Sequence, residues 1–417
     1  MSITAHRQVT TAEAALDSPG AYLAEMVSSV RPLLPCRLGL EDADGATLAE
    51  DVTACGPLPL FDNSAMDGYA VRAADVAAAT AAAPVILPVE AEVAAGDSRR
   101  LGLAAGTCAR IMTGAPIPLG ADTVVRAEWT DGGTTKVTIH QAVPSGSAIR
   151  RQGSEAAGAQ VLLTAGTPLG PAQIGLVAAA GRSSVLVRPR PRLTVLSAGN
   201  ELAPPGTVLG PGRIWESNSF MLVSAARRAG CLARRHQTAP DDRDRVLAAI
   251  NEAADADLII TSGGISMGGE RDSIKAALQG LGTASFCTVA IHPGKPQGFG
   301  VVGPSRTPVV MLPGNPVSAF VSFQLFVIPV VRALQGRAQE KPCVTGAQLT
   351  RPVRSPAGRR SFISGILDYQ SGTVTPAPGP SAHQLTALAQ ANALIIVPEE
   401  ITVLAEGATV ELLELPS

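Results

Sequence analysis

The alternation of apolar strands and helices over residues 192–335 is the feature that most constrains the fold. Apolar runs typical of strands (RLTVLSAG, LARRHQTA, ADLIITSGG, SFCTVAIHP, QGFGVVG and TPVVMLPG) are interleaved with helical patterns over 219–229, 241–254, 272–281 and 316–334. Strands that alternate with helices form βαβ units, in which parallel strands are joined by crossing helices. The region is therefore predicted to be an α/β domain with a mainly parallel sheet.

The rest of the chain has short strand patterns and few helices. Residues 84–140 read as a small all-β domain, residues 147–170 as a second set of short strands, and residues 342–417 as a small β-barrel or sandwich. Helical spacing predicts helices over 21–34 and 171–180, and the turn-rich stretch 36–60 is predicted to be a loop. The chain is thus expected to hold several domains.

Composition and charge exclude several classes of protein. Of 417 residues, 46% are hydrophobic, 16% are charged, and the net charge is -2, which argues against disorder and against a nucleic-acid partner. The six cysteines are widely spaced with no C-x-x-C pair, which argues against a zinc site and indicates reduced thiols in a cytoplasm. No secretory pattern opens the chain, and the apolar run 317–331 is short and interrupted by Ser, Gln and Pro, so a buried helix is predicted and no membrane span.

Three polar loops follow apolar strands of the α/β region. They are Ser197-Ala198-Gly199-Asn200-Glu201, Thr261-Ser262-Gly263-Gly264, and Pro313-Gly314-Asn315-Pro316. Ligands of open α/β sheets lie beyond the carboxyl ends of the strands. Glycine turns and helix starts bind anions, and Asn315 and Pro316 suit the cap and first position of a helix. Any one loop could be only a tight turn, but three together favour a shared phosphate-binding pocket.

The charged residues beside these loops could have either a ligand-binding or a structural role. Glu201 and Asp272 could hold Mg²⁺ against a polyphosphate, because Mg²⁺ prefers one or two carboxylates plus phosphate oxygens. Asp272 could equally cap the helix that begins at Ser273, and the spacing alone does not separate these readings. Lys295 is one of only four lysines and lies in a Pro/Gly turn, where it is either a solvated cation or an anion ligand.

The loop 61–70, FDNSAMDGYA, has an unusual density of polar residues next to apolar ones. Asx turns would explain two of its polar side chains but not the whole set. A second lobe of the binding pocket is therefore predicted here.

Five motifs in this order resemble one family. FDNSAMDGYAVR (61–72), RIMTGAP (110–116), TSGGISMG (261–268), PGKPQGFG (293–300) and LPGNPVSA (312–319) are similar to those of the molybdopterin molybdenumtransferases, MoeA and the gephyrin E domain, and the resemblance runs from about residue 10 to the end. It implies an extended dimerisation segment (1–55 and 142–188), a small β domain (56–141), a central MogA-like α/β domain (189–338) and a C-terminal β-barrel (339–417).

The resemblance also implies an activity and a set of site residues. Members insert molybdate into adenylylated molybdopterin and release AMP with the help of Mg²⁺, as homodimers whose active cleft combines the central domain of one subunit with motifs of the other. By motif, the implied catalytic residues are Asp62, Thr113, Asp272 and Lys295. The implied nucleotide and pterin site comprises Glu201, Ser262, Gly263, Gly264, Pro313, Gly314, Asn315, Pro316 and Ser381, with Asp272 and Glu201 on the metal.

Several positions depart from the family pattern. Asn200 and His292 stand where the family has an acid and a lysine. Gly269 is an extra residue before the acidic pair Glu270 and Asp272. Glu216 replaces an aspartate before Ser217 and Asn218, and Gly153-Ser154-Glu155 replaces G-E-D. Each change weakens or shifts a charge.

Three functions follow as hypotheses. The first is the molybdenum-inserting enzyme, with molybdopterin adenylyltransferase as a pathway partner. The second is a gephyrin-like scaffold with a receptor or cytoskeletal peptide in the groove between the central and C-terminal domains, which the altered segments favour. The third is an adenylyltransferase one step earlier, which the extra β domains and the 61–70 loop argue against.

Overall fold

The computed structural model describes residues 17–265, 272–280, 282–338, 344–379 and 383–415. The chain divides into two compact units. The first unit comprises 1–36, 45–49 and 187–417, and the second comprises 37–44 and 50–186. Ser381, Gly269 and Glu270 lie outside the described residues.

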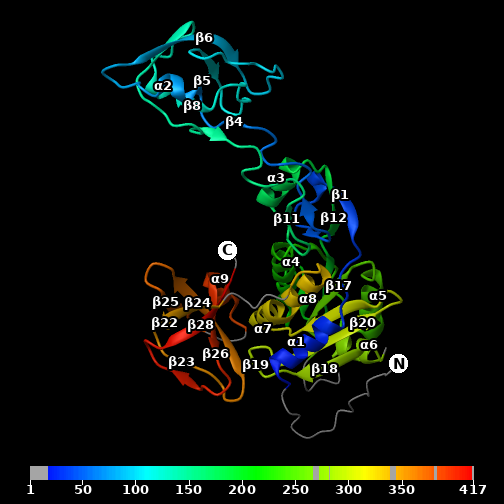
Figure 1. The fold of residues 1–417 in the computed structure, drawn as a ribbon. Helices are drawn as coiled ribbons and strands as arrows, with labels where there is room; N and C mark the ends of the chain where they lie inside the picture. Colours follow the sequence, from blue (N-terminus) through cyan, green and yellow to red (C-terminus); the bar gives the residue numbers. More distant parts are fainter. Residues whose placement is uncertain (1–16, 266–271, 281, 339–343, 380–382, 416–417) are drawn as a thin grey trace. The chain divides into compact units, whose positions relative to one another are not determined.

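The first unit is built on a six-stranded sheet (Figure 1). Its strand order is β16 (Leu232–Arg235), β13 (Arg192–Ser197), β17 (Leu258–Ser262), β21 (Thr307–Leu312), β20 (Pro296–Val302) and β18 (Ala284–Thr288). The first four strands are parallel, whereas β20 pairs antiparallel with β21 and β18 pairs antiparallel with β20. The predicted α/β domain with a mainly parallel sheet is confirmed.

Alternate residues of the central strands face two different cores. In β17, Ile260 belongs to a core with α1 (Pro19–Ser28), α4 (Asn218–Arg228) and the helical segment 316–334. Its neighbour Ile259 belongs to a second core with α5 (Arg243–Glu252) and α6 (Ser273–Gln279). Helices thus cover both faces of the sheet, as the period of two along a strand requires. The first helix ends at Ser28, earlier than the predicted 34.

The apolar run 316–334 is one helical segment with an irregular middle. It comprises α7 (Pro316–Ser322), a π turn (Phe323–Val327) and α8 (Ile328–Leu334). The segment is long and apolar enough to span a membrane, but 67% of its apolar window is buried inside the protein. Phe326 lies in the core with its ring centre 5.0 Å from that of Tyr22. The prediction of a buried helix is confirmed.

The C-terminal part of the first unit contains a closed barrel of five strands. In ring order these are β24 (Arg360–Asp368), β25 (Thr373–Pro376), β22 (Val344–Leu349), β28 (Thr409–Glu414) and β26 (Ala393–Val397), with β26 returning to β24. Strand β19 (Ile291–His292) pairs with β24. The same region also contains α9 (Leu385–Gln390), β23 (Val353–Arg354) and β27 (Val403–Leu404). Elsewhere in the first unit lie β14 (Leu202–Ala203) and β15 (Ile214–Trp215). The barrel reading of this region is confirmed.

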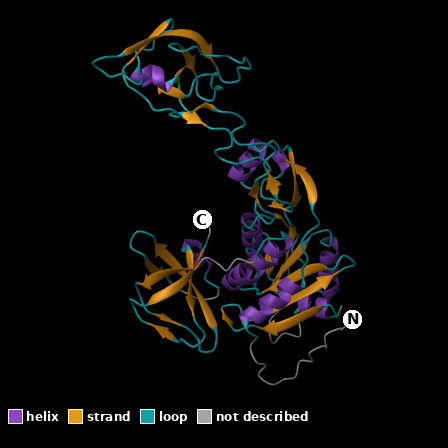
Figure 2. Cartoon of the chain, in the orientation of Figure 1, coloured by secondary structure: helices purple, strands orange, loops and turns teal. Residues whose placement is uncertain are grey.

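The second unit contains a five-stranded sheet (Figure 2). Its order is β8 (Thr123–Arg126), β5 (Gly68–Val71), β7 (Cys108–Ile111), β6 (Val85–Val93) and β9 (Lys136–Ile139). Its other elements are α2 (Ala73–Val76), α3 (Pro171–Ala179), β4 (Asn63–Ser64) paired with β10 (Ile149–Arg150), and short helices at Leu40–Asp42 and Ala127–Trp129. The small all-β region of the prediction is present.

The stretch 36–60 is not the loop that was predicted. It contains β1 (Cys36–Gly39), β2 (Thr47–Leu48) and β3 (Val52–Thr53). Strand β2 pairs with β12 (Ser184–Arg188), and β3 pairs with β11 (Val161–Leu163). The partners lie more than a hundred residues away, so the local pattern of turn residues did not reveal them.

Candidate functional site

The three predicted loops leave the same edge of the sheet. Parallel register places Ser197, the last residue of β13, opposite Ser262, the last residue of β17. Ser262 in turn lies opposite Leu312 at the end of β21. The carboxyl ends of the strands therefore bring the loops together, where α/β folds commonly bind ligands.

Backbone packing explains the glycines after β17. Gly263 and Gly264 have φ values of +91° and +61°. A Cβ on Gly263 would lie 3.1 Å from the carbonyl oxygen of Ala198, and one on Gly264 would lie 3.1 Å from the side chain of Ile274. The Gly263 N–H is already bonded to the Leu312 carbonyl at 3.1 Å, so that donor is part of the scaffold.

The loop after β21 packs directly against the glycine loop. A Cβ on Gly314 would lie 3.4 Å from the Cα of Gly263. The hydroxyl of buried Ser262 donates to the carbonyl of Pro313 at 3.2 Å and accepts from Asn218 Nδ2 at 2.9 Å. Asn315 occupies the cap position of α7 and Pro316 its first position, as predicted, although the Asn315 side chain makes no capping bond.

Glu201 lies over the first loop. Its two carboxylate oxygens would be 2.6 Å from a Cβ on Gly199, so the carboxylate lies directly over this glycine. The backbone carbonyl of Glu201 accepts from Ile214 N–H at 2.8 Å and from Arg213 Nε at 3.2 Å, while the residue itself is exposed. An exposed carboxylate on an anchored backbone is free to reach a bound ligand.

Asn200, which stands where the family has an acid, is fixed by Asp241. The Asn200 N–H donates to Asp241 Oδ2 at 3.3 Å, and the Asp241 N–H donates to Asn200 Oδ1 at 3.1 Å. The Ser273 hydroxyl donates to Asp241 Oδ1 at 2.8 Å. Asp241 thus links the first loop to the start of α6, a role that the sequence analysis missed although the acidic pair before α5 was visible.

Asp272 occupies the cap position of α6, but its side chain makes no capping bond. Its backbone carbonyl accepts from Ala276 N–H at 2.8 Å. The sequence left open whether Asp272 caps α6 or binds Mg²⁺. The structure places it at the cap position without the capping hydrogen bond. Among the described residues, no three acidic, histidine or cysteine side chains form a metal cluster. A Mg²⁺ held by one or two carboxylates and substrate phosphates needs no such cluster.

The turn that carries Lys295 is tightly built. His292–Pro293 is a cis peptide, and Gly294 follows with φ +105° and a Cβ position 3.0 Å from the Ser322 hydroxyl. Buried Gln297 donates to both the Gly294 carbonyl and the Ser322 hydroxyl at 2.6 Å. The turn is therefore anchored to α7, and Lys295 within it is half-buried.

His292 is not a replacement cation for the lysine of the family. Burial first, and then the positive charge of Arg359, hold the pKa of His292 below its ordinary value. His292 pairs in parallel with Ser361 of β24, and Arg359 lies two residues before Ser361 in the chain. Arg359 is a permanent cation that the sequence analysis did not single out, because only the pairing of β19 with the barrel brings it near.

Asp62 and Thr113 belong to the second unit and form their own polar cluster. Gln152 N–H donates to Asp62 Oδ1 at 2.7 Å and Arg151 donates to Oδ2 at 2.6 Å. The Gln152 N–H, and then Arg151, hold the pKa of the Asp62 carboxyl below its ordinary value. Asp62 is thus kept ionised as a hydrogen-bond acceptor.

Thr113 is paired with Asp67, another residue that the sequence analysis did not assign. The hydroxyl and N–H of Thr113 both donate to Asp67 Oδ1, at 2.7 and 2.6 Å. These bonds, the hydroxyl first, lower the pKa of the Asp67 carboxyl. Thr113 therefore orders the loop of the 61–72 motif from the neighbouring 110–116 motif.

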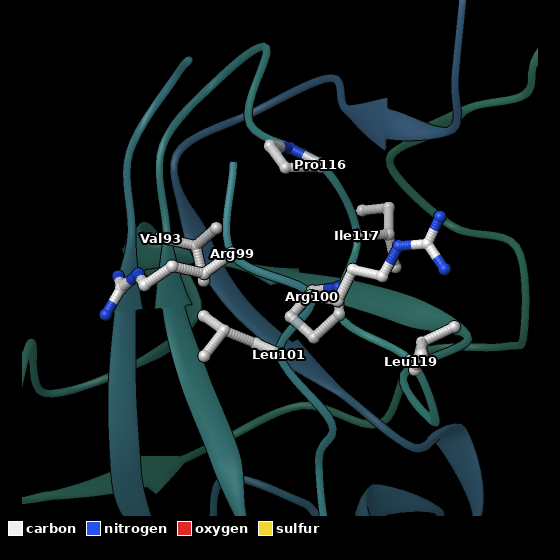
Figure 3. Close-up of a pocket in the computed structure, with 8 residues that line it drawn as sticks. Val93, Arg99, Arg100, Leu101, Pro116, Ile117 and Leu119 are labelled. Carbon is white, nitrogen blue, oxygen red and sulfur yellow. The ribbon is translucent and has the colours of Figure 1, made fainter. Parts of the chain in front are cut away.

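A separate pocket of the second unit contains none of the predicted residues (Figure 3). It is lined by Val93, Arg99, Arg100, Leu101, Pro116, Ile117, Pro118 and Leu119. Arg99 is engaged by Asp97 at 2.6 Å, and most of the lining is apolar. The geometry of the sheet edge, with its buried polar contacts, marks the better candidate site.

Gly263→Ala is expected to lower the free energy of unfolding more than Gly206→Ala does. Both positions have positive φ, which costs alanine about 1–2 kcal/mol. A Cβ at Gly206 meets nothing within 4 Å, whereas one at Gly263 meets the Ala198 carbonyl. Denaturant unfolding of the two variants measures the difference, and equal losses would contradict this account of the loop.

Thr113→Val is expected to raise the pKa of Asp67 toward its ordinary value, because one of two hydrogen bonds to the carboxylate is lost. The lowered pKa of Asp67 in the folded state stabilises the protein above the unfolded-state pKa, and this contribution disappears as pH falls through the folded-state value. The variant should therefore differ from wild type in stability at neutral pH and converge with it in acid.

Carboxyl-carbon NMR of Asp67 against pH measures the shift. Thr135→Val, on an exposed threonine of the same unit, is the matched control and should leave the titration of Asp67 unchanged. An unchanged titration in Thr113→Val would contradict the role given to the hydroxyl.

Comparison with known proteins covers nearly the whole chain. Family models match residues 5–181 (MoeA N-terminal region, domains I and II), 194–333 (probable molybdopterin binding domain) and 346–415 (MoeA C-terminal region, domain IV). Molybdopterin molybdenumtransferase 2 of Mycobacterium tuberculosis is 45% identical over 94% of this chain and 97% of its own length. Molybdopterin molybdenumtransferase 1 of the same organism is 36% identical over 87% of this chain and 91% of its own length.

A solved structure agrees with these matches. The molybdopterin biosynthesis MoeA protein of Pyrococcus horikoshii aligns with a TM-score of 0.78 and 26% identity, over 96% of this chain and 100% of the other. The resemblance carried by the five motifs is thereby confirmed. The chain belongs to the MoeA family of molybdopterin molybdenumtransferases, enzymes of molybdenum cofactor biosynthesis.

Proposed function

We propose that this chain inserts molybdate into adenylylated molybdopterin and releases AMP. The observation that carries the proposal is the meeting of the Ser262-Gly263-Gly264 and Pro313-Gly314 loops at the carboxyl edge of the sheet. Compact glycine loops of this kind let a phosphate approach the backbone closely. The names of the relatives favour the transferase over the scaffold and over the adenylyltransferase.

The residues of the first unit would bind the substrate by charge and by shape. Ser262, Gly263, Gly264, Pro313, Gly314, Asn315 and Pro316 would line the nucleotide and pterin site, and we keep Ser381 as a predicted contact. Lys295 would neutralise phosphate or molybdate charge, because a cation in a site of restricted water is worth more than in bulk solvent. Arg359, near His292, would add the permanent positive charge that His292 does not supply.

The carboxylates fit a Mg²⁺ ion that is shared with the substrate. Exposed Glu201 and half-buried Asp272 would be its protein ligands, and the chemistry supplied would be neutralisation of the pyrophosphate as AMP leaves. Asp62 would accept a hydrogen bond from water or from a protonated oxyanion, since its lowered pKa keeps it ionised. Thr113 would keep the motif loop ordered through Asp67.

We also propose a homodimer in the cytoplasm with the domain boundaries given above, and molybdopterin adenylyltransferase as the supplier of substrate. The described cysteines Cys36, Cys55, Cys108, Cys231 and Cys287 are free thiols, which suits a reducing compartment. Burial raises the pKa of Cys108, Cys231 and Cys287 to about 12, so these thiols are unreactive. Light scattering on the purified chain would measure the oligomeric state, and a monomer would contradict the dimer.

The test of the function is complementation together with AMP release. Expression of the chain in a strain that lacks the enzyme should restore molybdoenzyme activity, and the purified chain should release AMP from adenylylated molybdopterin only when molybdate is added. Absence of both at normal expression would refute the proposed reaction.

Asp272→Asn is expected to lower molybdate-dependent AMP release by about a hundredfold, because removing one anionic ligand weakens the hold on the metal and the charge on the pyrophosphate is less well balanced. Binding of AMP, measured by calorimetry without Mg²⁺, should stay within about twofold of wild type, since the amide is isosteric. Asp244→Asn, at an exposed position of α5, is the control. Unchanged AMP release in Asp272→Asn would remove this residue from the metal site.

A further inference from the structure

Asn218 ties together the two glycine loops of the candidate site. It is the first residue of α4, and its Nδ2 donates to Ser262 Oγ at 2.9 Å and to the Gly314 carbonyl at 2.7 Å. Both Nδ2 hydrogens are thereby used. The amide orientation follows from the Gly314 carbonyl, because the reverse orientation would place two acceptors against each other.

The other end of the same amide is unsatisfied. Asn218 Oδ1 is buried and has no hydrogen-bond partner in the described part of the chain. A buried carbonyl oxygen without a donor is unfavourable, and native proteins rarely leave one without a reason. At an edge lined by ligand-binding loops, the missing donor is one that a ligand can bring.

A buried carboxylate holds Asn218 in this position. Glu216 is 2% exposed and accepts from Ser219 N–H at 2.7 Å, from the Ser219 hydroxyl at 2.5 Å and from the Ser197 hydroxyl at 3.0 Å. These bonds fix the first turn of α4 to the end of β13. Arg235 compensates the charge, 3.6 Å from Glu216 and stacked 4.0 Å from the ring centre of Phe220.

The chemistry of the acceptor selects the part of the substrate that it contacts. A phosphate or molybdate at neutral pH presents mainly acceptor oxygens, which Oδ1 would repel, whereas adenine carries N–H donors on its exocyclic amino group and pterin carries them on its ring and amino group. An acceptor oxygen on the amide that bonds both glycine loops therefore suits an N–H donor of a heterocycle rather than an anionic group. Through its bonds to Ser219 and Ser197, Glu216 fixes the first turn of α4 and with it the position of Asn218.

We propose that Asn218 contacts the substrate, with Oδ1 accepting a hydrogen bond from an N–H of its heterocycles, either the adenine amino group or a pterin N–H, and that Glu216 is its positioning residue. The proposal rests on the proposed function for the identity of the ligand. It adds a recognition of the heterocycle to a site that otherwise binds anionic groups.

The first experiment compares AMP with purine riboside 5′-monophosphate, which lacks the exocyclic amine, by calorimetry. If adenine is the donor, wild type should prefer AMP by about tenfold, as one hydrogen bond to a buried acceptor is worth. Asn218→Ala should bind both ligands with affinities within about twofold of each other. Asn251→Ala, at an exposed position of α5, is the matched control and should keep the wild-type preference.

The second experiment identifies a pterin donor. If wild type binds the two nucleotides equally, Asn218→Ala should weaken binding of adenylylated molybdopterin about tenfold more than it weakens binding of AMP. Asn218→Ser serves in place of Asn218→Ala if the alanine variant does not fold.

A third variant tests the positioning role. Glu216→Gln should reduce the wild-type ligand preference, whichever ring provides it, while Arg235 and the fold are retained. A preference that is unchanged in Glu216→Gln would overturn the role of Glu216.

The proposal is overturned if Asn218→Ala weakens all three ligands by the same factor, since Asn218 would then only join the loops. This result is distinguishable from failure of the proposed function, in which wild type itself would release no AMP when molybdate is added.

Discussion

Close packing of backbone at the carboxyl edge of one parallel sheet is the constraint on which the candidate site depends. The register of β13, β17 and β21 brings the ends of the three strands side by side. The loops that leave these ends have little room for side chains, so Gly263 and Gly264 adopt positive φ against their neighbours. Asn218, the first residue of α4, joins the second and third loops, and Asp241, just before α5, joins the first loop to the start of α6.

The near-neutral chain concentrates its electrostatics in a few local arrangements. Asp62 and Asp67 of the second unit are held ionised by backbone and side-chain donors. In the first unit, burial and then Arg359 lower the pKa of His292, and Arg359 and the nearby Lys295 supply positive charge beside it. The replacement of a lysine by His292 therefore changes how the positive charge is supplied, rather than leaving the turn neutral.

Sequence patterns predicted the parts of the molecule that depend on local periodicity. The α/β alternation, the buried helix 316–334 and the glycine loops were all visible, because apolar period and turn residues encode them directly. Strands β2 and β3 were missed, since their partners are distant in sequence. Asn218, Asp241 and Arg359 were missed as site residues for a related reason: each acquires its place only when separate elements pack together. The roles of the predicted site residues themselves stay predictions.

The pairing of β19 with β24 has a consequence for synthesis on the ribosome. Ile291 and His292 pair with Arg360 and Ser361, roughly seventy residues later in the chain. At about 5–20 residues per second, translation delays this partner by several seconds after the Lys295 turn has been made. During that interval the backbone groups of Ile291 and His292 are without their partners in β24. Completion of the barrel region thus both pairs these groups and brings Arg359 to His292.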